Sequence, residues 1–405
     1  MARVFSLPTV LRQVPKALLG QFFEKLDVSF PEVEWGSLGE RNIQPILTVL
    51  YELPNSQLVP VERELRTVYE IACETGINAL VETAVSLGES GLAERMPPDQ
   101  THYGQAMWVW LHHRDYFPHA ELVVQIENLS WWRKRNDLPC KDKGWQPCDP
   151  EPFRAAISKL LLTEQGRGRL CSADVLLRDG VHYFFLYPDD FVQSVTEHDD
   201  QGKLSPRAIR RTFNIVLAYR AVDGELELFA KVPGKLKPRI EEIFAKEILG
   251  KDLGAWEPPA AYHLNHLRLR TTPLVVDPGD AVTVSVRRLK FKIVGTKRII
   301  ELEADPDLGP RDIFDMIDEC LNREKLKLAD LRVASARLVF EFLELGDRKP
   351  GTISVDIGHP SSCNLRGHRP ERVEIIRKYL VRWGIDARTH HASTGATPRA
   401  ASAVA

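Results

Sequence analysis

The spacing of apolar residues along this chain changes from a helical period to a period of two. Between residues 16 and 88, apolar side chains recur every three or four positions and place one apolar stripe on each of several short helices. Between residues 170 and 231, apolar and polar side chains alternate, as they do in strands with one buried face. This change predicts a helical N-terminal segment followed by a segment built on a β-sheet.

Two Asp-Gly pairs separate the alternating runs of the second segment. Asp179-Gly180 follows CSADVLLR, and Asp223-Gly224 lies between TFNIVLAYRAV and ELELFAK. Asp-Gly favours the two-residue turns of β-hairpins, because both residues tolerate positive φ. We therefore expect two hairpins in a mostly antiparallel sheet with one solvated face, and an amphipathic helix at 236–249 that covers the apolar face.

Beyond residue 280 the expected elements follow the order strand, strand, helix, strand, strand, helix. The expected strands are 281–294, 297–304, 331–344 and 351–357, and the expected helices are 310–323 and 370–383. This order is typical of an α+β sandwich. The predicted fold class of the whole chain is multidomain α+β, with a helical N-terminal segment followed by two mostly antiparallel sheet domains that carry covering helices.

Changes in composition suggest where the domains begin and end. A chain of 405 residues is too long for a single hydrophobic core. Prolines cluster between the two sheet segments, and the last residues are rich in Ala, Ser and Thr without periodicity. The predicted division is a helical domain at 1–125, an α+β domain at 126–255, a proline-rich linker at 256–279, an α+β domain at 280–386 and a disordered tail at 387–405.

The overall charge argues neither for nor against a nucleic-acid partner. Lys and Arg number 54 and Asp and Glu number 56, so only a local patch could bind a polyanion. Six widely spaced cysteines do not form a disulfide framework. Arg12, Gln13 and Pro15 interrupt the apolar residues near the N-terminus, and no run approaches the roughly 20 apolar residues of a membrane span. We expect a soluble cytoplasmic protein with no membrane partner, and the sequence indicates neither a cofactor nor an oligomeric state.

Acidic residues at strand ends are the candidate catalytic residues. Metal-dependent nucleases of the PD-(D/E)xK type place an acid, and then an acid and a lysine two residues apart, around Mg²⁺. Asp189, Asp190 and Glu227 could supply the acids, but Lys231 follows Glu227 by four positions. The alternative is that Glu225, Glu227 and Lys231 form the solvated face of an antiparallel strand.

Basic residues of the C-terminal domain are the candidate polyanion-binding residues. In VSVRRLKFKI, cations alternate with apolar residues, so one face of the expected strand is cationic, and Lys297 and Arg298 add to it across the turn. The full set is Arg288, Lys290, Lys292, Arg366, Arg369, Arg372 and Lys378. The alternative is an ordinary solvated surface.

The segment HPSSCNLRGHRP lies between the last expected strand and helix. Its free backbone N–H groups could hold a phosphate at the helix start. His359, Cys363 and His368 could instead bind a metal ion, or Cys363 could act as a nucleophile with a histidine base. The remaining interpretation is a turn whose serines and asparagine satisfy backbone groups.

Residues 131–148 contain two further candidates. The cluster WWRKR at 131–135 could stack on single-stranded bases, but buried tryptophans at a charged helix end are the favoured interpretation. Cys140 and Cys148 are separated by seven residues, whereas the cysteine pairs of structural zinc sites are separated by two to four. We therefore predict loop thiols and no metal ligands here.

Several common catalytic signatures are absent from the sequence. It contains no phosphate-binding G-x-x-x-x-G-K-[ST] loop, no G-x-G-x-x-G after a strand, no H-E-x-x-H and no G-x-S-x-G. The leading interpretation is a non-enzymatic binding or assembly protein whose C-terminal domain holds nucleic acid, another polyanion or an acidic protein partner. The alternatives are a metal-dependent hydrolase or nuclease, and an accessory component of a mobile-element or anti-phage (antiviral defence) system.

Overall fold

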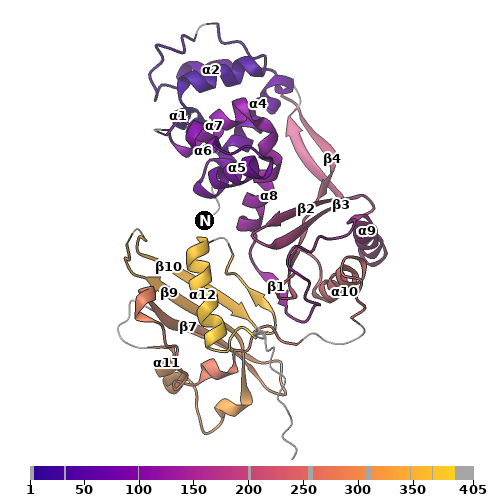
Figure 1. The fold of residues 1–405 in the computed structure, drawn as a ribbon, viewed down its shortest axis with the longest axis vertical. Helices are drawn as coiled ribbons and strands as arrows, with labels where there is room; N and C mark the ends of the chain where they lie inside the picture. The colour runs from indigo at the N-terminus through magenta and orange to yellow at the C-terminus, as the bar shows by residue number, and fades with distance from the viewer. Residues whose placement is uncertain are drawn as a thin grey trace, which may run out of the picture. The chain divides into compact units, whose positions relative to one another are not determined.

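The described part of the chain forms two compact units. The computed structural model describes residues 4–387 except 32, 99, 199–201, 254–258, 306–311, 347 and 367. The first unit comprises the residues up to Asn128 together with Ser194–Ala208, and the second comprises the remaining residues from Leu129 onwards. Figure 1 labels most of the helices and strands.

The first unit is built from short helices with buried apolar faces. Its helices are α1 (Leu7–Gln13), α2 (Lys16–Lys25), α3 (Gln44–Glu52), α4 (Asn55–Ile71), α5 (Glu74–Ser86), α6 (Leu92–Arg95), α7 (His102–His112) and α8 (Phe117–Asn128). Ser6 and Thr101 cap α1 and α7 by accepting hydrogen bonds from backbone N–H groups of the first turn. The helical period of the N-terminal segment therefore predicted this unit correctly.

A glycine lies where two helices of this unit meet. Gly76 is in the first turn of α5, where its backbone N–H donates to the N-cap residue Cys73. A β-carbon at Gly76 would lie 2.1 Å from the carbonyl oxygen of Ile71. The glycine is therefore required by the close approach of α4 and α5, and not by a left-handed helix end.

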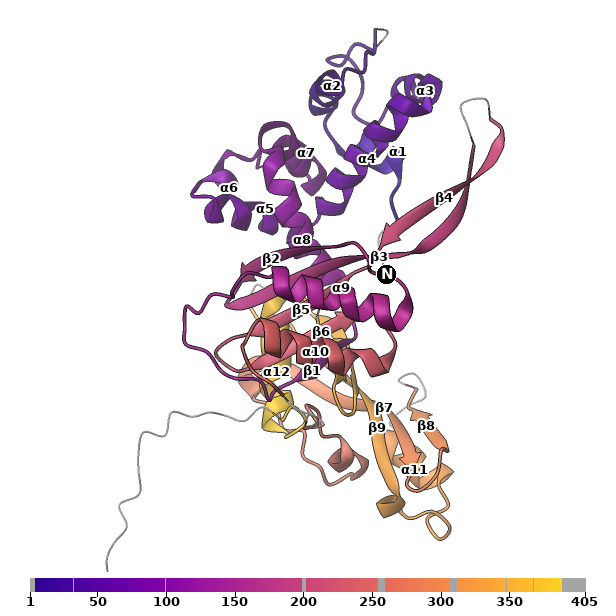
Figure 2. The same cartoon turned by 90° about the vertical axis from the view of Figure 1, so that its right-hand side faces the viewer.

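The second unit is organised around one antiparallel sheet, and two strands of this sheet include residues of Ser194–Ala208 that belong to the first unit. Its strands are β1 (Trp132–Arg135), β2 (Cys171–Arg178), β3 (Val181–His198), β4 (Leu204–Thr212), β5 (Ile215–Arg220), β6 (Glu225–Ala230), β7 (Val282–Ile293), β8 (Ile299–Glu303), β9 (Leu331–Phe342), β10 (Gly351–Gly358) and β11 (Ser362–Cys363). The strand order is β2-β3-β5-β6-β1-β11-β10-β9-β7-β8, and β4 pairs with β3 as a long ribbon (Figure 2). The predicted α+β class is confirmed, and the division of this unit into two domains stays a prediction.

Both predicted hairpins form. Asp179 and Gly180 are the two turn residues between β2 and β3, with φ of 51° and 72°, whereas the four residues 221–224 connect β5 to β6, and Gly224 has a φ of 63°. A β-carbon at Gly224 would also lie 2.2 Å from the carbonyl oxygen of Leu138, so two independent constraints select glycine there.

The prediction of a solvated face on this part of the sheet is wrong. Glu225 and Glu227 are only 4% and 9% exposed, and nearly every residue of β5 and β6 is buried. One face packs against α9 (Glu151–Gln165) and α10 (Lys237–Glu247), as Figure 2 shows. The alternation of Glu and Leu in β6 therefore reflects an ionic face opposite an apolar one, and both faces are buried.

β1 also corrects the sequence prediction. WWRKR was interpreted as a charged helix end, but α8 ends at Asn128, and residues 132–135 form a strand between β6 and β11. The sequence WRKR lacks the apolar alternation of a strand, because both faces of β1 carry cations that meet buried carboxylates. Only tertiary pairing identifies this segment as a strand.

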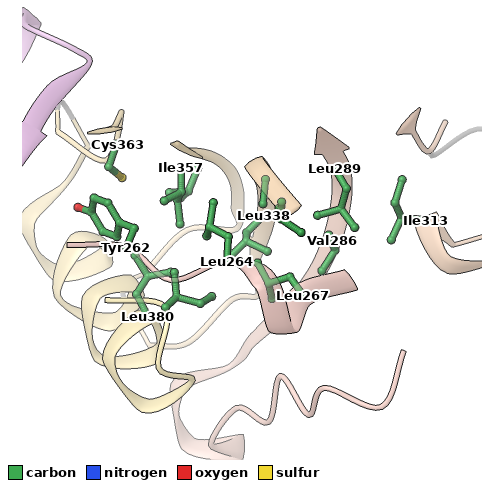
Figure 3. Close-up of a cluster of buried hydrophobic side chains, with 14 of the residues drawn as sticks. Tyr262, Leu264, Leu267, Val286, Leu289, Ile313, Leu338, Ile357, Cys363 and Leu380 are labelled. Atoms are coloured by element: carbon green, nitrogen blue, oxygen red, sulfur yellow. The ribbon is translucent and has the colours of Figure 1, made fainter. Parts of the chain in front are cut away.

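The C-terminal strands share a second apolar core. Side chains of β7, β9 and β10 meet α11 (Ile313–Cys320) and α12 (Pro370–Arg382) there, as Figure 3 shows with Ile313 beside Leu289 and Leu380 beside Tyr262. Residues 261–267, which belong to the predicted linker, also contribute buried side chains. Of the predicted disordered tail, all but Ala387 lies outside the described residues.

None of the helices in the described part of the chain is both long enough and apolar enough to cross a bilayer.

Candidate polyanion-binding surface

The cationic face predicted on β7 is partly neutralised. The Arg288 guanidinium lies 2.6 Å from a carboxylate oxygen of Asp356, and the Lys290 ammonium lies 3.0 Å from Glu301. Arg337, which lies opposite Arg288 on β9, also pairs with Asp356 at 2.9 Å. Carboxylates therefore balance the cations along the first part of this face.

The end of the same face carries cations without carboxylate partners. Lys292 on β7 lies directly opposite Arg332 on β9, and both side chains are exposed. Lys297 and Arg298, in the turn between β7 and β8, are exposed at the same end of the sheet. Within the described ranges none of these four cations has an ion-pair partner. We call these four residues the basic end.

The pairing of Lys292 with Arg332 is electrostatically unfavourable in the isolated protein. Directly opposite residues of an antiparallel pair point to the same face, with their β-carbons about 5 Å apart. Like charges at such positions destabilise a sheet by roughly 0.2–1 kcal/mol. Residue patterns predicted Lys292 but not Arg332, because the register of β9 against β7 includes a bulge near Lys290 that such patterns do not show.

Arg366 was a predicted surface cation, but it is held in the interior. Its Nε donates to Glu227 at 3.1 Å, its Nη1 donates to the Tyr183 hydroxyl at 3.2 Å, and its guanidinium lies 4.3 Å from the ring centroid of Trp132. Burial by itself raises the pKa of Glu227, but Arg366, Arg377 and Lys134 outweigh it and hold the pKa at about 2. Arg366 therefore has a buried carboxylate as its partner.

The other predicted cations near α12 are placed differently. The Lys378 ammonium lies 2.7 Å from both Asp277 and Asp280. The Arg372 guanidinium donates to the Lys349 carbonyl at 2.5 Å. Arg369 is exposed at the N-cap of α12. Local contacts within the protein therefore occupy Lys378 and Arg372.

The candidate catalytic carboxylates are not brought together. Asp189 pairs with Arg210 at 3.1 Å and accepts the backbone N–H of Leu170 at 3.0 Å, while Asp190 pairs with Arg167 at 2.7 Å. These contacts fasten the loop at 166–170 to the end of the buried part of β3.

Glu227 lies elsewhere on the same sheet. It is opposite Ala218 on β5, which is opposite Tyr183 on β3, and Asp189 is six residues further along β3. At about 3.3 Å per residue, this separates the two carboxylates by roughly 20 Å. Within the ranges that the structure describes, no group of three or more His, Cys, Asp or Glu side chains is arranged to hold a metal ion.

Cys363 lacks the environment of a nucleophile. Its side chain is buried, and burial raises the pKa of the thiol to about 12, so it is uncharged at neutral pH. The ring of His359 is bonded through Nδ1 to the Tyr262 carbonyl at 2.9 Å. Asn364 accepts the backbone N–H of Asp356 at 2.8 Å, which is the role expected of a turn residue.

The structure also contains a buried ionic cluster that the sequence did not indicate. The Lys134 ammonium lies 2.9 Å from both Glu225 and Asp386, next to the pair of Arg366 and Glu227. These groups surround a cavity of about 10 Å³, which is no larger than a single water requires. The cluster connects β1 and β6 to the segments that follow β11 and α12, and its size favours a structural role.

Comparison with protein-family models gives no match, and comparison with curated proteins gives none either.

Proposed function

We propose that the protein binds a nucleic acid through the basic end, formed by Lys292, Lys297, Arg298 and Arg332. The observation that carries the proposal is the position of Lys292 directly opposite Arg332 on the neighbouring strand, with no carboxylate to balance either charge among the described residues. A phosphate between the two cations would convert this repulsion into two charge-assisted contacts.

The distribution of acids supports this location. Glu301, Glu303 and Asp356 lie among the cations further along the face and would repel a polyanion there. On this face, the basic end is therefore the part where a polyanion meets cations without ion-pair partners among the described residues, although the whole chain has a net charge of only −2. Contacts of this kind neutralise phosphates, and they read little of the base sequence.

The arrangement of the acids favours binding over metal-dependent hydrolysis. Asp189, Asp190 and Glu227 each hold an arginine, at two places on the sheet that are about 20 Å apart. The proposed activity is therefore that of a binding or assembly protein.

The test is a titration of the full chain and of the variant K292Q/R332Q against single- and double-stranded DNA and RNA at several salt concentrations. The variant should bind more weakly to every sequence. For duplex DNA, the slope of log affinity against log salt should become shallower by up to about 1.8, since each lost phosphate contact removes roughly 0.9.

The matched control is K246Q/K251Q, which removes the same charge from two exposed lysines at the end of α10 and after it. It should leave the slope unchanged. K292Q/R332Q should also keep or slightly raise its free energy of unfolding, by up to about 1 kcal/mol, because the cross-strand repulsion is removed. Equal effects of the two variants on binding, or no binding by the wild type at low salt, would refute the proposal.

A further inference from the structure

An open groove lies on the helical unit at the end of α2. It has a volume of about 480 Å³, which is within the range of ligand sites in proteins. Its lining residues are Gly20, Phe23, Glu24, Asp27, Val28, Ser29, Phe30 and Trp35. All of them belong to the first unit, so the groove is complete within that unit.

Three aromatic rings in mutual contact line the groove. The ring centroids of Phe23 and Phe30 are 4.5 Å apart, those of Phe30 and Trp35 are 5.4 Å apart, and those of Phe23 and Trp35 are 5.9 Å apart. Phe23 and Phe30 are buried, whereas Trp35 is half-buried. The aromatic surface that a ligand can reach in the groove is therefore mainly that of Trp35, which the two buried phenylalanine rings support.

Gly20 allows Trp35 to pack closely against α2. A β-carbon at this position would lie 3.0–3.3 Å from three atoms of the Trp35 ring. Glycine inside a helix is destabilising relative to alanine, because it loses more backbone entropy on folding. Its presence in the middle of α2 is explained by the indole ring, which needs the space that a side chain would fill.

Two carboxylates share the groove with these rings. Glu24, at the end of α2, and Asp27, just beyond it, are both exposed and line the groove. In the part of the chain that the structure describes, neither has an ion-pair partner. The neighbouring cation, Lys25, donates instead to the carbonyl of Leu111 at 2.6 Å. The groove therefore combines aromatic surface with uncompensated negative charge.

We infer that this groove binds an arginine or lysine side chain presented by a basic segment of a protein partner. Aromatic faces attract a cation through the ring quadrupole, and the carboxylates can form charge-assisted hydrogen bonds to its N–H groups. Sites for small molecules bury most of their ligand, whereas this groove is open along the surface and suits a side chain that arrives on a polypeptide.

The test uses a fluorescent peptide of alternating glycine and arginine, with a matched peptide in which citrulline replaces arginine as the uncharged probe. Binding to the full chain is measured by anisotropy at low salt. The wild type should bind the arginine peptide, and E24Q/D27N should weaken this binding by about tenfold or more, because both charges are lost without a change in packing. Asn tolerates the positive φ of 57° at residue 27.

The matched control is E52Q/E94Q, which removes two exposed carboxylates from other helices of the same unit. It should bind the arginine peptide as the wild type does. W35L should weaken binding while far-ultraviolet circular dichroism confirms that the helices are intact.

Three outcomes would overturn the inference. The first is equal binding of the citrulline peptide, and the second is equal loss in E24Q/D27N and E52Q/E94Q. The third is a concentration-dependent dimer of the wild type that W35L abolishes, because the occupant would then be a second copy of the chain.

Discussion

Glu227 and Arg366 should be strongly coupled in the stability of the protein. Their side chains form a buried ion pair, and the carboxylate keeps a pKa of about 2 where an unperturbed glutamate has 4.5. A difference of this size corresponds to roughly 3 kcal/mol at neutral pH, since one pKa unit is about 1.4 kcal/mol. Removing one partner of a buried ion pair lowers the free energy of unfolding by a similar amount, about 3–5 kcal/mol.

The perturbations are E227Q, R366M and the double variant. E227Q should lower the free energy of unfolding at pH 7 by about 3 kcal/mol, because Arg366 keeps a buried charge without its nearest carboxylate. R366M should cost somewhat more, since it also removes the contact of the guanidinium with Trp132. The double variant should lose roughly 2–3 kcal/mol less free energy of unfolding than the two single variants lose in sum, because it leaves no uncompensated charge at this pair.

The dependence on pH provides a second measurement. Because the folded pKa of Glu227 is depressed, its contribution is fully present above pH 4.5 and is lost as the pH falls towards 2. The difference in stability between the wild type and E227Q should therefore shrink from about 3 kcal/mol at pH 7 to about 1 kcal/mol at pH 3. Urea denaturation at both pH values measures this difference in stability. Hydrogen exchange in β1 and β6 shows where in the structure the stability is lost. A coupling energy below about 0.5 kcal/mol, or a difference that does not change with pH, would show that the pair is not coupled in this way.

Two smaller perturbations test local structure. G224A should lower the free energy of unfolding by about 2 kcal/mol or more, because it combines a positive φ with a close approach to the Leu138 carbonyl, whereas G180A, with open space around its β-carbon, should cost only about 1 kcal/mol. D312A should lower the free energy of unfolding by about 1 kcal/mol, because it removes the capping box of α11, whereas D312N keeps the capping oxygen and should lower it by only a few tenths. Urea denaturation measures the free energy of unfolding of all four variants. Equal losses within either pair would contradict the reasoning.

Local patterns in the sequence were sufficient for most helices and hairpins. The helical period identified α2 and α12, and the Asp-Gly turns identified the β2–β3 and β5–β6 hairpins, because these features depend on residues close together in the chain. The strand β1 was missed, since its cations are explained only by carboxylates such as Glu241, 106 residues beyond Arg135.

The candidate site was predictable to a similar extent. Lys292, Lys297 and Arg298 were found because strand alternation and a short turn place them together. Arg332 was not found, because its position opposite Lys292 depends on the register of two strands about 40 residues apart, with a bulge between them. Arg366 was assigned to the surface because charge alone cannot distinguish an exposed cation from one paired with a buried carboxylate.

The position of β11 next to β1 has a consequence for synthesis of the chain on the ribosome. Trp132 pairs with Cys363, so 231 residues must follow Trp132 before its partner on β11 has been synthesised. At about 5–20 residues per second, this interval lasts on the order of 10–50 seconds. An unpaired strand edge invites pairing with other chains, and charged side chains on it oppose such contacts. β1 carries three successive cations, Arg133, Lys134 and Arg135. These charges would therefore oppose aggregation of the nascent protein until β11 has been synthesised and completes the sheet.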